Sequence, residues 1–130
     1  MKTIIQEIKF KAEPKELYEL YMNSKKHSLV TEQKAVLSRK VGGSYSAYDG
    51  YIKGKNLALI SGKRIVQTWR ASNWSKSVMD SIFILTFEKA GGGTEVTMVH
   101  ANLPDKEKKH LAKGWYDCYW NLWKKHLEKK

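Results

Sequence analysis

The chain has 130 residues, 42% of them hydrophobic, and a formal net charge of +11. This length suits a single domain with its own core, and the single cysteine, Cys118, excludes an internal disulfide. No run of about 20 apolar residues is present to span a membrane, and no secretory signal is recognisable. We therefore expect one domain, residues 1–130, in the reducing environment of the cytoplasm.

The positive charge favours an anionic partner such as nucleic acid or an acidic protein surface. Only Arg39, Arg64 and Arg70 supply guanidinium groups, which bind phosphates and base edges through paired hydrogen bonds. The rest of the excess is lysine, spread over every segment. A solvated lysine surface is therefore favoured over nucleic-acid binding.

The N-terminal part predicts a strand followed by helical structure. Residues 3–11 alternate between apolar and polar side chains, which is typical of a strand. Pro14 then stands where the first turn of a helix accepts proline, and apolar residues follow at helical spacing. Asn23 and Ser24 mark a stop and a new start. We expect two short helical segments here.

Residues 35–101 change to a period of two, with glycine-containing turns between the apolar runs. This pattern predicts an antiparallel meander, and because no helical segment interrupts it, a parallel sheet is not expected. The expected strands are 35–39, 44–48, 51–60, 64–71, 77–88 and 94–101.

Pro104 and Asp105 open a last segment that contains no further proline and predicts one long helix. At 100° per residue, its apolar side chains cover an arc of roughly 200°. An arc this wide predicts a helix that lies in a curved sheet and is touched on its flanks. The apolar positions are Leu111, Trp115, Tyr116, Cys118, Tyr119, Trp120, Leu122, Trp123 and Leu127.

Five segments carry a resemblance to a known family. They are VGGSYSAYDGYIKGKN (41–56), GKRIVQTWR (62–70), the Asn73-Trp74 pair, GGGTEVTM (91–98) and KGWYDCYW (113–120). In this order they resemble the C-terminal domain of the activator of the 90-kDa heat-shock protein ATPase, which belongs to the START-like superfamily, also called SRPBCC or helix-grip. The resemblance covers essentially the whole chain.

This resemblance implies an α+β helix-grip fold. In that fold a curved antiparallel sheet of about seven strands wraps around a long C-terminal helix, with two short helices after the first strand. It also implies a cavity between sheet and helix, which in many relatives holds a small apolar molecule. The family's activators carry a separate N-terminal domain for chaperone stimulation, whose motifs do not occur in these residues. Only the contact role of the C-terminal domain is therefore implied.

The residues that commonly carry catalysis form no obvious set. The histidines His27, His100, His110 and His126 show no metal-ligand spacing with one another or with the cysteine, so no metal and no cofactor is expected. Cys118 falls on the apolar side of the last helix, which favours a buried, inert thiol. We therefore expect a protein that is not an enzyme, with a small enzyme that uses the cavity as the alternative.

Aromatic residues with polar tips suggest the walls of a cavity. Tyr45 and Tyr48 are three positions apart, an odd spacing, so we expect only one of them to point inward. His100 shares the expected inner face with apolar neighbours and either contacts a ligand or is satisfied within the protein. For Trp69 and Trp115, packing in the core is the alternative. The candidate cavity residues are Tyr45, Tyr48, Tyr51, Trp69, Phe83, Leu85, Met98, His100, Trp115, Tyr119 and Leu122.

A second candidate surface is basic. Lys53, Lys55, Lys63 and Arg64 lie near turns and could meet an acidic partner such as a chaperone domain, or form a solvated rim. The leading hypothesis is a binding protein for a small apolar or aromatic molecule. The alternative is an interaction module that contacts the 90-kDa heat-shock chaperone. The sequence leaves the oligomeric state open.

Overall fold

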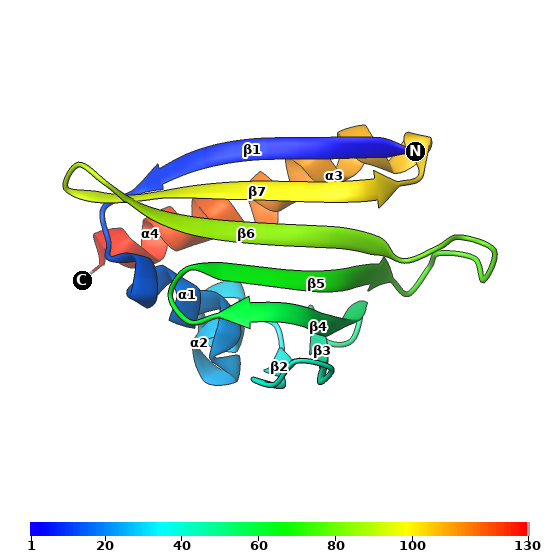
Figure 1. Cartoon of the computed structure of the whole chain (residues 1–130), viewed down its shortest axis with the longest axis horizontal. Coiled ribbons are helices and arrows are strands. Elements are labelled where there is room, and N and C mark those ends of the chain that lie inside the picture. The colour runs from blue at the N-terminus through cyan, green and yellow to red at the C-terminus, as the bar shows by residue number, and fades with distance from the viewer. Residues whose placement is uncertain (130) are drawn as a thin grey trace.

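The computed structural model describes residues 1–129, and Figure 1 shows a curved sheet with the helices on one side of it. The chain runs through β1 (Lys2–Phe10), α1 (Pro14–Met22), α2 (Ser24–Thr31), β2 (Val36–Leu37), β3 (Ser44–Ala47), β4 (Ile52–Ile60), β5 (Arg64–Ala71), β6 (Ser81–Ala90) and β7 (Gly93–Leu103). A last helical segment follows. Within the described residues, no helix combines the length and the apolar character that crossing a bilayer requires.

The seven strands form one antiparallel sheet in the order β1-β7-β6-β5-β4-β3-β2. Strands β2 to β7 make the predicted meander, and β1 joins it at the β7 edge, where Ile4 pairs with His100 and Phe10 with Thr94. Residues of alternating burial along each strand place one face of the sheet inward. The prediction of an antiparallel sheet is confirmed.

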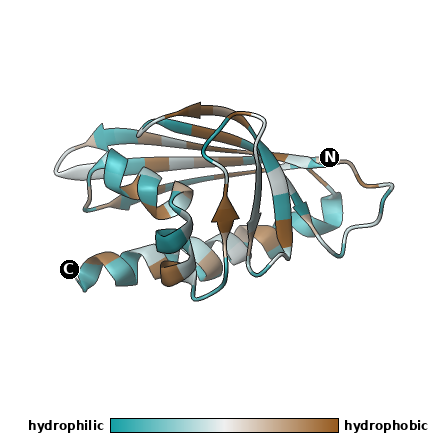
Figure 2. Cartoon of the chain, turned by 90° about the horizontal axis from the view of Figure 1, so that it is seen from below, coloured by the Kyte–Doolittle hydropathy of each residue, from teal (hydrophilic) through white to brown (hydrophobic). Residues whose placement is uncertain are grey.

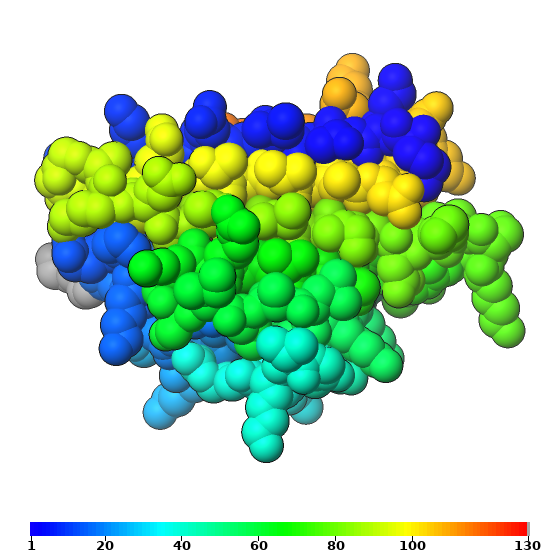
Figure 3. All heavy atoms as spheres, viewed as in Figure 1, coloured from blue at the N-terminus to red at the C-terminus, as the bar shows by residue number. Residues whose placement is uncertain are grey.

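One predicted strand begins later than expected. The segment 77–88 was expected to be extended throughout, but β6 starts only at Ser81. The Arg70 guanidinium holds the preceding connection as a loop, because it donates to the Val78 carbonyl at 2.5 Å and to the Asp80 carboxylate at 3.1 Å. Figure 3 shows this β5–β6 connection standing out from the body of the molecule at the right.

The predicted C-terminal helix is present but is not one regular α-helix. It consists of a 3₁₀ turn η1 (Asp105–Glu107), α3 (Lys108–Trp115), a π-helical segment η2 (Tyr116–Trp120) and α4 (Asn121–Glu128). In the π segment the Asn121 N–H donates to the carbonyl of Tyr116, five residues earlier. The added residue lets two consecutive aromatic side chains, Tyr119 and Trp120, both lie in the core.

The helices cover the inner face of the sheet. Figure 2, seen from below, shows the C-terminal helix and the short helices lying along this side of the strands. The helix α1 also packs on this side, where the Tyr18 ring lies 5.8 Å from the Phe87 ring of β6. The two short helices after β1 and the curved sheet around the C-terminal helix confirm the predicted helix-grip fold.

Candidate ligand pocket

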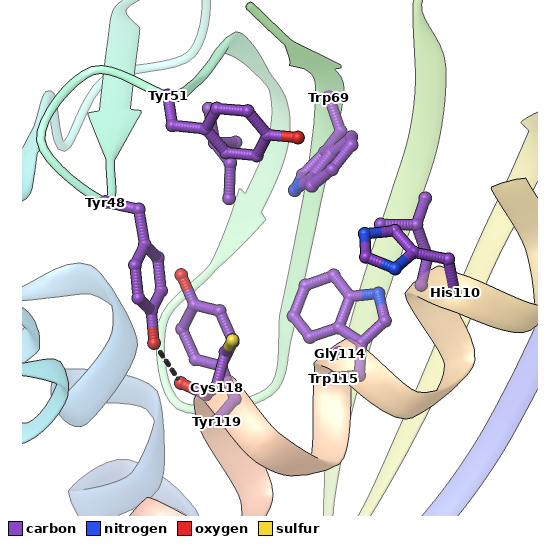
Figure 4. Close-up of a pocket in the computed structure, with 10 residues that line it drawn as sticks. Tyr48, Tyr51, Trp69, His110, Gly114, Trp115, Cys118 and Tyr119 are labelled. Atoms are coloured by element: carbon purple, nitrogen blue, oxygen red, sulfur yellow. Dashed lines mark hydrogen bonds between the residues drawn. The ribbon is translucent and has the colours of Figure 1, made fainter. Parts of the chain in front are cut away.

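An apolar pocket of about 280 Å³ lies between the first half of the C-terminal helix and strands β4 and β5. Aromatic rings form most of its walls, as Figure 4 shows. Its lining residues are Tyr48, Tyr51, Ile52, Trp69, His110, Leu111, Gly114, Trp115, Cys118 and Tyr119.

The turn between β3 and β4 forms one wall of the pocket. Tyr48 and Asp49 have positive φ angles of 51° and 56°, and Gly50 has 87°. This left-handed turn directs the Tyr48 side chain to the helix, where its O–H donates to the Cys118 carbonyl at 2.5 Å. Positive φ is uncommon for a bulky residue such as tyrosine, so this hydrogen bond helps to hold the conformation.

The expectation that only one of Tyr45 and Tyr48 points inward is wrong. Strand β3 ends at Ala47, so the alternation of a strand no longer governs Tyr48. Tyr45 is buried and lies across Gly54, where its O–H donates to the Thr68 carbonyl at 2.6 Å. Both tyrosines therefore face the interior, but only Tyr48 reaches the pocket.

Two tryptophans form the opposite wall, and a buried polar pair holds them. The Trp115 N–H donates to His100 Nδ1 at 3.0 Å, so Nδ1 is an acceptor and His100 Nε2 carries the proton. This Nε2–H donates to Ser81 Oγ at 2.8 Å, and the Ser81 hydroxyl donates to the Trp69 carbonyl at 2.7 Å. The His100 ring also lies edge-on to Trp69, with 4.8 Å between ring centroids. The pair therefore ties the two pocket tryptophans together.

His100 itself does not line the pocket. Its side chain is 0% exposed, and burial lowers its pKa to about 3, so the ring is neutral near pH 7. The sequence left two interpretations of His100 open, contact with a ligand or hydrogen bonds within the protein. The structure supports the second, because both ring nitrogens bond protein groups.

A second buried network, which the sequence did not indicate, supports Tyr119. His27 Nδ1–H donates to the Tyr21 carbonyl at 2.8 Å, so Nε2 accepts the Tyr119 O–H at 2.9 Å. Burial lowers the pKa of His27 to about 4, against a smaller raising effect of the Tyr21 carbonyl. The Tyr21 O–H in turn donates to Gln67 Oε1 at 2.9 Å. Tyr119 is thus fixed in place as part of the pocket wall.

The pocket stays open because the helix presents little volume at one position. Nothing lies within 4 Å of a Cβ built on Gly114. Glycine inside a helix costs roughly 0.5–1 kcal/mol relative to alanine. Cys118, one turn later, is also small and is only partly buried. The expectation of a fully buried thiol is therefore corrected, since the open pocket exposes it.

The structure brings together five of the eleven predicted cavity residues, namely Tyr48, Tyr51, Trp69, Trp115 and Tyr119. The others lie elsewhere. Phe83, Leu85 and Met98 are completely buried in the core, and Leu122 lies one turn after Cys118 and is half-buried. Sequence reasoning missed Ile52, His110, Leu111, Gly114 and Cys118. Leu111 lies four residues before Trp115 and Cys118 three after it, so these two could have been found from helical spacing.

The four basic candidates lie apart from the pocket lining. Lys53 and Lys55 are exposed on β4, and Lys63 and Arg64 are exposed at the turn into β5. They therefore occupy two places on the sheet and not one rim. Among residues 1–129, no group of three or more His, Cys, Asp or Glu side chains is placed to hold a metal ion.

A curved antiparallel sheet that grips a long C-terminal helix, with an apolar pocket between them, defines a START-like domain. The sequence model of the family described as "Activator of Hsp90 ATPase homolog 1-like protein" matches residues 11–128. The chain therefore belongs to this family, which confirms the resemblance found in the sequence.

Curated relatives agree with this assignment. The chain is 35% identical over 115 residues to "Activator of 90 kDa heat shock protein ATPase homolog" of Dictyostelium discoideum, covering 88% of this chain and 30% of that protein. It is 30% identical over 110 residues to "Activator of 90 kDa heat shock protein ATPase homolog 1" of Homo sapiens, covering 85% of this chain and 32% of that protein. The chain thus spans about a third of the length of these relatives.

Solved structures share the fold at lower identity. The Aha1 dimer from Colwellia psychrerythraea superimposes with a TM-score of 0.76 at 21% identity, covering 89% of each chain. An HSP90 activator from Plasmodium falciparum gives a TM-score of 0.75 at 20% identity, covering 80% of this chain and 75% of the other.

Proposed function

We propose that this domain binds a small, mostly apolar ring compound in the pocket between β4, β5 and the C-terminal helix. The observation that carries the proposal is a cavity of about 280 Å³ with aromatic walls, kept open by Gly114 in an otherwise well-packed core. An engineered apolar cavity of about 150 Å³ is known to take up benzene. A compound with one or two fused rings is therefore the size that this pocket suits.

Binding without catalysis is the mode that the side chains favour. Tyr119 is held in a hydrogen bond to His27, and His100 lies behind the pocket wall with both ring nitrogens used. His110 is the one histidine among the lining residues, and no Asp or Glu lines the pocket with it to complete an acid–base pair. Burial lowers the pKa of His100 to about 3, which makes it a poor base near neutral pH. We therefore propose that the pocket holds its ligand and does not transform it.

A leucine at position 114 tests this proposal. The Gly114→Leu side chain would extend into the pocket, and we expect it to weaken the binding of indane or 1-indanone at least tenfold. Binding is followed by ¹H–¹⁵N NMR at the indole N–H groups of Trp69 and Trp115, which both line the cavity.

The matched control is Lys113→Leu, which adds the same side chain one residue earlier at an exposed position. This variant should bind both compounds like the unchanged protein. If neither compound shifts any resonance of a pocket residue in the unchanged protein, the proposal is wrong.

A second proposed role is contact with the 90-kDa heat-shock chaperone. It is supported by membership of the family and by the names of the curated relatives, which are activators of that chaperone's ATPase. The exposed cations Lys53, Lys55, Lys63 and Arg64 are the proposed contact residues. The cytoplasmic location expected from the sequence stays a prediction.

Charge reversal tests this contact. Replacing the four cations by glutamate should abolish the binding of purified 90-kDa chaperone, measured by calorimetry at low and moderate salt. Lys124→Glu with Lys125→Glu, on the outer face of α4, is the control at a distant exposed site. Equal loss in both sets would indicate a general charge effect and would contradict a specific contact.

A further inference from the structure

Among the tyrosines and tryptophans of the pocket wall, one donor has no partner in the described residues. The Trp69 side chain is 4% exposed, yet its indole N–H donates to none of the acceptors among the described residues. No fully enclosed side-chain nitrogen or oxygen in residues 1–129 lacks a hydrogen bond, so this N–H must border open space. Figure 4 shows the Trp69 nitrogen directed into the pocket.

The other polar groups of the aromatic walls are already used. Each of them donates to a protein acceptor, so Trp69 is the exception among the tyrosines and tryptophans that line the cavity. The pairs are Tyr48 with the Cys118 carbonyl, Tyr51 with Asn73 Oδ1, Trp115 with His100 Nδ1 and Tyr119 with His27 Nε2.

The free donor is also held rigidly. The Trp69 ring packs against His100 and against Trp74, with centroid distances of 4.8 and 5.6 Å. The Ser81 hydroxyl bonds its backbone carbonyl. A rigid donor loses little conformational entropy when it forms a hydrogen bond. An acceptor placed opposite this N–H would therefore be favoured.

We propose that the pocket selects a flat ring compound that carries a neutral hydrogen-bond acceptor, such as a ketone or amide carbonyl, directed at Trp69 Nε1. This inference rests on the proposed ligand-binding function and adds the chemical class of the ligand. A neutral acceptor fits better than a carboxylate, because no lysine or arginine is among the lining residues and an unpaired buried charge is costly. Trp69 is then the residue that determines specificity.

A pair of compounds of nearly equal shape tests the inference. Indane has no acceptor, whereas 1-indanone has one carbonyl on the same bicyclic frame. We expect 1-indanone to bind the unchanged protein roughly fivefold more tightly than indane, although water solvates its carbonyl better. In Trp69→Phe this preference should disappear, because the N–H is gone while an aromatic wall remains.

The indole resonances supply a second readout that needs no variant. The Trp69 Nε1–H signal should move downfield with 1-indanone and not with indane. The Trp115 Nε1–H, which already donates to His100, should keep its hydrogen-bonded position with both compounds. Trp123→Phe, in the part of the core remote from the pocket lining, is the matched control and should keep the preference for 1-indanone.

The possible results separate the two proposals. Equal affinity for the two compounds, or a preference that survives in Trp69→Phe, would overturn the role of Trp69 and leave ligand binding intact. No binding of either compound would overturn the proposed function and this inference together.

Discussion

The two halves of the C-terminal helix face the same sheet but make different contacts with it. In the second half, Trp120 and Trp123 pack on Phe10 of β1 with ring centroids 5.2 to 6.4 Å apart, and all three are almost fully buried. In the first half, the small residues Gly114 and Cys118 do not fill the space between helix and sheet, and the pocket lies there. A surface groove of about 310 Å³ at the end of the packed half is lined largely by charged side chains and lies outside the core.

This difference teaches that the pocket is a matter of side-chain volume and not of backbone architecture. One continuous helix and one continuous sheet produce both a dense core and an open cavity. The space is filled where the indoles of Trp120 and Trp123 face the strands, and it stays open beside Gly114. The polar networks follow the same division, because both buried histidines support residues of the pocket half.

A fall in pH should have the largest effect on the free energy of unfolding, and it should act on the pocket half of the C-terminal helix. Burial lowers the pKa of His27 to about 4 and that of His100 to about 3, whereas histidines of the unfolded chain take up protons from about pH 6.5. Their contribution to stability is therefore complete above pH 6.5 and is lost as the pH falls. Between pH 6.5 and 4 we expect each histidine to reduce the free energy of unfolding by about 3 kcal/mol, measured by urea unfolding at each pH.

The variant His100→Gln separates the two contributions. It should be less stable near pH 7, but its stability should fall about half as steeply with acid, since only His27 remains buried. A slope unchanged from that of the original protein would contradict the assignment. Long-range ¹H–¹⁵N spectra should also find the proton on Nε2 of His100 and on Nδ1 of His27, as their hydrogen bonds require.

Truncation should affect the packed half far more than the pocket half. Trp120→Ala removes a completely buried indole whose N–H donates to Gln6 Oε1 at 2.8 Å, so we expect a loss of about 3–5 kcal/mol in the free energy of unfolding. Cys118→Ala, at the edge of the pocket, should cost less than about 1 kcal/mol, because the removed sulfur already borders open space. Guanidinium unfolding at constant pH measures both.

Similar losses for the two variants would mean that the pocket is filled in solution. A small loss for Trp120→Ala would mean that the packed half relaxes around the missing ring.

The smallest expected effect concerns the turn that closes the pocket. Tyr48→Phe removes the O–H that donates to the Cys118 carbonyl, and we expect a loss of about 1 kcal/mol in stability. The matched change Tyr51→Phe removes an exposed bond of 3.2 Å to Asn73 and should cost close to nothing. Hydrogen exchange at the amides of residues 48–51 should accelerate only in Tyr48→Phe. Equal behaviour of the two variants would argue against the anchoring role of Tyr48.

Much of the fold could be predicted from the sequence because its periodicities are clear. The period of two between residues 35 and 101 and the turn residues between the runs define the meander, and the long apolar arc defines the last helix. The late start of β6 could not be predicted, because it depends on the contact of the Arg70 guanidinium with carbonyls of a loop. Such a contact between a strand and the following loop leaves no periodic signal.

The site was less predictable for a different reason. A helical projection at 100° per residue assumes a regular α-helix, and on that basis Leu122 was expected to line the cavity whereas Trp123 was not. The π segment adds one residue to a turn, so Trp123 is buried and Leu122 is only half-buried. The buried histidine networks also depend on side chains from distant segments, such as His27 with Tyr119, whose proximity only the tertiary structure establishes.

The π segment Tyr116–Trp120 has a consequence for how such a domain can diversify. Removal of one residue there would turn all that follows by about 100° and shift it by about 1.5 Å, while α3 would keep its position on the sheet. The π segment therefore separates the part of the helix that shapes the pocket from the part that packs on β1. If the pocket binds a ligand as proposed, mutations before the π segment would change what it accepts, while Trp120 and Trp123 keep the packed core.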